Sequence, residues 1–160
     1  MGTQLVMTNI ADPIKIAAKS YPTHGLICGF VMLPDQRIQD LAGRSLDEMF
    51  ALSTAKVWLH FNARTGAARD WIQRCERIPE ASRRLLLDTD DHKCLERSGD
   101  GLIAVISDIR YDFGLDFDPE QMATLRFYLD QNYLISTRQQ PSNATDQLRT
   151  EIKQGRYFDS

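Results

Sequence analysis

The densest set of metal-binding side chains in the sequence lies in the stretch DTDDH: Asp88, Asp90, Asp91 and His92. Hard cations such as Mg²⁺ and Ca²⁺ are held by several convergent carboxylate oxygens. The stretch departs from a calcium-binding loop, because Lys93 stands at its sixth position instead of glycine and Gly99 at its twelfth instead of glutamate. These four residues are the candidate regulatory cation site of the sequence, but taken alone they favour a solvated loop between a helix and a strand.

A second candidate lies in the stretch VWLHFN, where His60 and Asn62 follow a strand-like run. His60 shares one face of the expected strand with Trp58, which favours a hydrogen-bonded structural histidine over a ligand or a base. Asn62 stands where a helix is about to begin, which favours a cap or a turn over catalysis. The stretch is thus predicted to be scaffold.

The other motif fragments lack their required context. DFG at 112–114 has no glycine-rich loop and no kinase catalytic loop beside it in the sequence. We find no P-loop, dinucleotide fingerprint, nucleophile elbow or HExxH helix. The three cysteines (Cys28, Cys75 and Cys94) are far apart, odd in number and without zinc-site spacing. We predict no enzyme activity, no catalytic residue and no cofactor in this domain.

Periodic apolar patterns indicate the elements that would position these residues. Ser45 to Glu48 forms a capping box, and apolar stripes predict further helices over about 67–75, after Pro79 and after Pro141. Trp71 is expected to be largely buried against the sheet. Strand-like segments are expected to share one mixed sheet flanked by helices, at about 25–33, 57–61, 94–98, 102–111, 122–129 and 133–138. A shorter strand is expected around Ile38, between the first of these segments and the first helix. The pattern is that of an α/β domain.

Whole-chain properties limit the possible partners. A chain of 160 residues is predicted to form one domain, preceded by a weakly structured lead-in over 1–22. The net charge of −3 gives no electrostatic footprint for nucleic acid. The longest apolar run, 25–33, is about half the length of a membrane-spanning helix, and no secretory signal is recognisable. The sequence therefore predicts a soluble intracellular chain.

The order of the segments resembles a known family. VWLHFN is followed by a helix carrying DWI, a helix with Leu85 to Leu87, the stretch GDGLIAVISDIRYD, and the hairpin TLRFYLDQNYLISTR. Within that hairpin, Tyr128-Leu129-Asp130 leads to Ile135-Ser136-Thr137-Arg138. This combination is similar to the cytoplasmic N-terminal domain of the CorA family of divalent-cation channels, and most similar to its zinc-transporter ZntB branch.

The resemblance implies a three-layer α/β/α domain over 23–160, with a mixed, largely antiparallel sheet. Five such domains would form a funnel around the ion vestibule, on the cytoplasmic face of the inner (cell) membrane. Mg²⁺ or Zn²⁺ would be the transported or regulatory ion. A stalk and two transmembrane helices would follow beyond this chain and provide its only contact with the membrane. The full protein would be a homopentamer, and the isolated domain a monomer or weak oligomer. The alternative is a stand-alone α/β enzyme or ligand-binding domain whose site no motif reveals.

One region departs from the family pattern. Many relatives carry an acidic residue in the helix before the fourth strand and then an Arg-Pro stretch. Here Arg84 and Leu85 occupy the acidic positions, and the stretch 92–94 replaces Arg-Pro. In magnesium-transporting members this acidic region contributes to a cation sensor between subunits. The displaced acids at 88–91 are the candidates to take over that role.

Overall fold

A computed structural model describes residues 25–51, 55–108 and 122–155. Within these ranges the chain forms seven strands and four helices, in the order predicted from the sequence. The elements are β1 (Leu26–Met32), β2 (Ile38–Asp40), α1 (Leu46–Phe50), β3 (Lys56–Asn62), α2 (Gly66–Arg74), α3 (Glu80–Leu87), β4 (Cys94–Ser98), β5 (Gly101–Asp108), β6 (Ala123–Leu129), β7 (Tyr133–Arg138) and α4 (Asn143–Lys153). The part of the expected strand at 109–111 lies outside the described residues.

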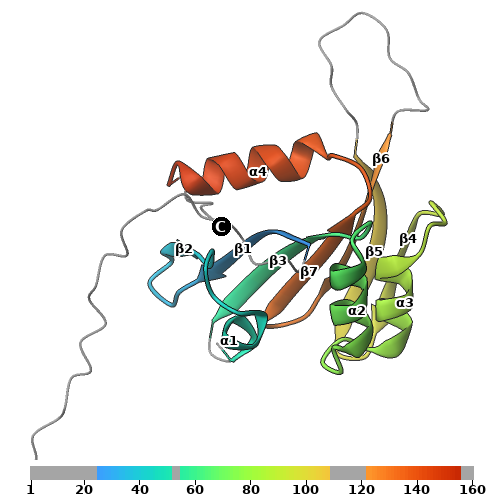
Figure 1. Cartoon of the computed structure of the whole chain (residues 1–160), viewed down its shortest axis with the longest axis horizontal. Coiled ribbons are helices and arrows are strands. Elements are labelled where there is room, and N and C mark those ends of the chain that lie inside the picture. Colours follow the sequence, from blue (N-terminus) through green and yellow to red (C-terminus); the bar gives the residue numbers. More distant parts are fainter. Residues whose placement is uncertain (1–24, 52–54, 109–121, 156–160) are drawn as a thin grey trace, which may run out of the picture.

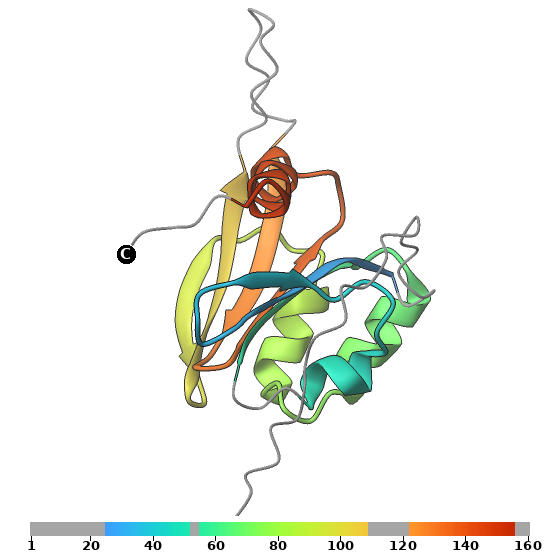
Figure 2. The same ribbon diagram turned by 90° about the vertical axis from the view of Figure 1, so that its left-hand side faces the viewer.

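The strands form one sheet in the order β2-β1-β3-β7-β6-β5-β4. Only the central pair β3–β7 is parallel, and all other neighbours are antiparallel. Helices α2 and α3 lie together on one face, and α4 lies on the opposite face (Figure 1). The view turned by 90° shows the same separation (Figure 2). The predicted three-layer architecture with a mixed, largely antiparallel sheet is confirmed.

Local signals in the sequence account for the element boundaries. The capping box before α1 is formed, because Ser45 N donates to Glu48 Oε2 at 2.8 Å and Glu48 N donates to Ser45 Oγ at 3.2 Å. Gly155 follows α4 with a φ of +73°, a conformation that glycine adopts without strain. These boundaries follow from side chains and glycine positions that the sequence alone displays.

The main core lies between the sheet and the α2–α3 pair, and its central side chains are fully shielded from solvent. They include Leu59, Phe61, Ile72, Leu86 and Ile135. Trp71 packs against this core with only a minor part of its surface exposed, in agreement with the expected burial. Its ring stacks on Phe61 with centroids 5.0 Å apart, at the margin of this core. Ala68 and Ile72 are the buried residues of the apolar stripe of α2, and Trp71 lies at the edge of that stripe.

The opposite face of the sheet, under α4, is less fully covered. Its buried apolar cluster consists of Cys28, Phe30 and Trp58, with Leu148 and Ile152 of α4 partly buried against it. Further along this face, beyond α4, apolar side chains of the β4–β5–β6 region remain exposed: Leu95 (69%), Leu102 (39%), Ile106 (43%) and Leu129 (40%). The sheet therefore has one densely packed face and one partly open face.

Candidate functional site

The candidate cation residues lie in the loop between α3 and β4. Asp88 is the C-cap residue of α3, and the side chains of residues 88–92 are all exposed. The fold thus brings Asp88, Asp90, Asp91 and His92 into a single solvent-accessible loop, as the sequence predicted.

Two of the carboxylates organise the loop itself. Asp88 Oδ1 accepts hydrogen bonds from the backbone N–H groups of Thr89 at 2.7 Å and Asp90 at 3.1 Å. Asp90 Oδ1 accepts from the backbone N–H of His92 at 3.2 Å. The backbone hydrogen bonds lower the pKa of the Asp88 carboxyl below its usual value, because they stabilise the charged form. Each of these two exposed acids uses one oxygen as a turn acceptor, and its other oxygen forms no hydrogen bond within the described residues.

The third carboxylate has a buried partner that the sequence analysis did not identify. Asp91 Oδ1 lies 3.0 Å from Nη2 of Arg126 in β6, and the same nitrogen donates to the backbone carbonyl of Asp90 at 2.8 Å. The Arg126 side chain is only 2% exposed, whereas that of Asp91 is 66% exposed. A hydrogen bond from Thr124 and then the guanidinium of Arg126 lower the pKa of the Asp91 carboxyl. Asp91 is therefore the counter-ion of a buried cation.

The alternation of side chains in β6 did not predict that Arg126 is buried. In β6, Thr124, Arg126 and Tyr128 point toward the α2–α3 side, where Arg126 and Tyr128 are buried. Leu125, Phe127 and Leu129 point toward the partly open face. A strand in which the more polar set faces the core cannot be oriented from hydropathy alone. An arginine inside a strand, with an acidic loop elsewhere in the chain, was the available signal.

The described part of the chain contains no group of three or more histidine, cysteine, aspartate or glutamate side chains arranged to hold a metal ion. His92 is exposed, and Cys94 begins β4. Because Asp91 is already paired, a cation at this loop would be held chiefly by Asp88 and Asp90, with ligands from elsewhere needed to complete its coordination. The cation site remains a prediction.

His60 and Asn62 have the structural contacts expected of them. His60 is 1% exposed, and its Nδ1 lies 2.8 Å from Ser136 Oγ, which also accepts a hydrogen bond from Trp58 Nε1 at 2.8 Å. Burial, followed by the nearby charge of Arg138, lowers the pKa of His60 to about 3. Asn62 Oδ1 accepts from the backbone N–H of Arg64 at 3.0 Å. The neutral histidine and the turn asparagine thus fix the β3–α2 region.

Helix α4 is attached to the sheet through its first turn. Asp108, at the end of β5, accepts hydrogen bonds from the Ser142 hydroxyl and from the backbone N–H of Ala144, the latter at 3.0 Å. Arg138 of β7 pairs with Asp146 at 3.0 Å. An anion at a helix N-terminus is favourable, because it meets the unpaired N–H groups there. These contacts fix the start of α4 over the open face.

Residues 53–160 match the family model described as "CorA-like Mg2+ transporter protein". The chain belongs to this CorA-like family. It is 29% identical over 98 residues to the zinc transport protein ZntB of Klebsiella pneumoniae, an alignment that covers 61% of this chain and 29% of the relative. For ZntB of Yersinia pestis the identity is 27% over 105 residues, covering 66% of this chain and 32% of the relative. The chain thus spans about a third of the length of these CorA-like relatives.

Two solved structures share the fold of this chain. The full-length CmaX protein superposes with a TM-score of 0.71 at 21% identity, covering 87% of this chain and 42% of CmaX. The ZntB cytoplasmic domain from Vibrio parahaemolyticus gives 0.60 at 20% identity, covering 81% of this chain and 50% of that domain. At these identities the likeness establishes the fold. Among the described residues, no helix has the length and apolar character of a membrane span.

Proposed function

We propose that this chain is the cytoplasmic domain of a CorA/ZntB-type divalent metal-ion transporter, where it forms part of the wall of the ion vestibule. The observation that carries the proposal is the family match over residues 53–160. The similarity to ZntB relatives and the fold shared with a ZntB cytoplasmic domain support the same assignment. Mg²⁺ or Zn²⁺ is then the transported or regulatory ion.

In this proposal residues 23–160 form the domain and residues 1–22 a lead-in. The domain lies at the cytoplasmic face of the inner membrane and is joined to it only through helices that follow in a longer protein. The full protein is a homopentamer. The isolated domain is a monomer or weak oligomer, since the stalk and membrane helices would contribute most of the subunit contacts.

The proposed regulatory role belongs to the loop with Asp88, Asp90, Asp91 and His92. Its support is the clustering of exposed carboxylates at the end of α3, two of which keep a free oxygen beside their turn hydrogen bonds. Arg126 neutralises Asp91, so the loop alone supplies too few oxygens for a hard cation. A neighbouring subunit or the stalk would complete the coordination.

The direct test uses the complete reading frame that contains this chain. The encoded protein is reconstituted in vesicles that hold a fluorescent indicator, and Zn²⁺ or Mg²⁺ is added outside. We expect divalent-cation entry and a pentamer by mass measurement in detergent. A complete product without membrane-spanning helices, or a membrane protein that carries neither ion, would overturn the proposal and revive the enzyme or ligand-binding alternative.

A further inference from the structure

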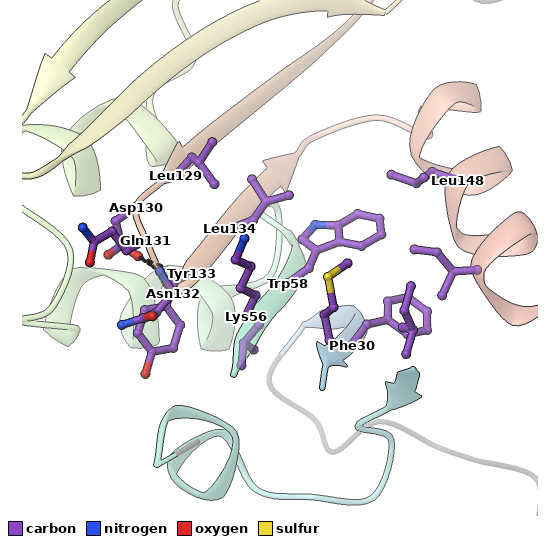
Figure 3. Close-up of a pocket in the computed structure, with 14 residues that line it drawn as sticks. Phe30, Lys56, Trp58, Leu129, Asp130, Gln131, Asn132, Tyr133, Leu134 and Leu148 are labelled. Carbon is purple, nitrogen blue, oxygen red and sulfur yellow. Dashed lines mark hydrogen bonds between the residues drawn. The ribbon is translucent and has the colours of Figure 1, made fainter. Parts of the chain in front are cut away.

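A pocket of about 360 Å³ lies between α4 and the sheet (Figure 3). Phe30 of β1, Trp58 of β3 and Leu134 of β7 line its sheet side, and Leu148 and Ile152 line its α4 side. Small-molecule sites in proteins are concave, largely apolar and of about 300–1,000 Å³. The pocket has the size and character of such a site.

The pocket has one polar end, formed by Lys56 and the β6–β7 turn at 130–132. Lys56 is exposed, and within the described ranges its side chain forms no hydrogen bond or ion pair. Asp130 is the acidic residue of this turn. Its Oδ1 accepts hydrogen bonds from the backbone N–H groups of Asn132 at 2.8 Å and Tyr133 at 2.7 Å. An ammonium group without a partner therefore stands at the mouth of an apolar cavity.

The walls of the pocket are held in place independently of any ligand. The first turn of α4 is fixed by Asp108 and by the Arg138–Asp146 pair, so the second half of the helix stands over the sheet. On the sheet side, Trp58 is held by its hydrogen bond to Ser136 and lies 5.7 Å from the ring of Phe30. A preformed cavity loses little ordering entropy when a ligand enters it.

We propose that this pocket binds a medium-chain carboxylate, with its acyl chain between Trp58 and α4 and its carboxylate on the ammonium group of Lys56. The cavity volume corresponds to on the order of ten groups of the size of a water molecule, close to the size of a methylene group. The unpaired ammonium group of Lys56 favours an anionic head, and the lining offers no second positive charge for a doubly charged ligand, because its other charged residue is the carboxylate Asp130. The site is on the face opposite to the Arg126 side, so it is separate from the candidate cation loop.

The experiment is a fluorescence titration with decanoate. The protein contains two tryptophans, and Trp71 packs on Phe61 at the opposite face. In a Trp71→Phe background, Trp58 therefore reports on the pocket. We expect a saturable blue shift of the emission, with an affinity that rises about fourfold for each methylene group from octanoate to decanoate. Lys56→Gln should weaken decanoate binding about two- to fivefold and leave decanol binding unchanged.

A variant that fills the pocket distinguishes binding inside the pocket from non-specific binding of decanoate to the protein surface. Leu148→Trp should abolish decanoate binding while urea melts show that the domain remains folded; the binding change is then followed by calorimetry. Three results would overturn the proposal: no saturable signal at millimolar decanoate, binding that Lys56→Gln and Leu148→Trp leave unchanged, or sedimentation showing that a second copy of the chain covers this face. The last result would assign the face to self-association.

Discussion

The two faces of the sheet are formed by the same strands but differ in how completely helices cover them. On the α2–α3 side, side chains such as Leu59, Ile72 and Leu86 are completely buried, and a buried arginine has a carboxylate partner. On the α4 side, one helix covers part of the sheet, a pocket remains beneath it, and leucines of β4, β5 and β6 reach solvent. The first face contains most of the closely packed core, and the second keeps the pocket and the exposed apolar surface to which we assign ligand binding.

The largest expected effect compares one leucine from each face. Leu86→Ala removes a side chain that is 0% exposed and leaves a cavity in the main core, so it should cost about 2–5 kcal/mol of unfolding free energy. Leu148→Ala removes a partly buried side chain beside an existing pocket and should cost about 1 kcal/mol. Urea melts of both variants provide the measurement. Equal losses would mean that both faces are packed alike.

Low pH should destabilise the domain through protonation of His60, which lies beneath α4. Its pKa is lowered from 6.5 to about 3 in the folded state, so between these values the unfolded chain binds a proton that the folded chain does not. Stability should therefore fall as the pH falls below about 6.5, by about 1.4 kcal/mol per pH unit for this residue. The measurement is the difference between wild type and His60→Gln from pH 7 to 5, above the main carboxylate titrations. Parallel pH profiles would show that His60 is protonated without cost.

The Asp91–Arg126 pair tests the electrostatics of the closed face. Asp91→Asn keeps the shape of the side chain but removes the charge opposite the buried guanidinium, and should cost about 1–3 kcal/mol. Asp90→Asn is the matched control, because Arg126 contacts only the backbone carbonyl of Asp90, which the substitution retains. If thermal or urea melts give the same small loss for both variants, Arg126 does not depend on Asp91.

The weakest expected effect is metal binding by the isolated domain. With Asp91 paired, the loop should bind Mg²⁺ or Ca²⁺ no better than millimolar, because these ions need more oxygen ligands than Asp88 and Asp90 supply. Calorimetry with the double variant Asp90→Ala/Asp91→Ala as control measures this. Micromolar Mg²⁺ binding that the double variant abolishes would mean that the loop is a complete site by itself.

The sequence predicted the elements well because its local signals are strong. The capping box at Ser45, the alternation in 123–138 and the apolar stripe of α2 each depend on near neighbours in the chain. The quoted segments also led to the correct family, since their order is preserved over most of the chain. These features are readable without knowing which elements pack together.

The features that the sequence did not predict depend on contacts between distant residues. Arg126 and Asp91 are 35 positions apart, and only the path of β6 past the α3–β4 loop brings them together. The part of Trp71 that stays exposed depends on the angle at which α2 meets the sheet, which periodicity does not specify. The pocket arises from the spacing between α4 and five different strands. Such features follow from tertiary geometry rather than from any local pattern.

Native-state hydrogen exchange tests the contrast between the two faces most directly, because it reports the opening free energy of each helix separately. The backbone amides of α2 and α3 should exchange only through global unfolding. The amides in the second half of α4, over the pocket, should exchange through a local opening of lower free energy. Equal protection of α4 and α3 across denaturant concentrations would contradict the account and show that the α4 face is as firmly closed as the other.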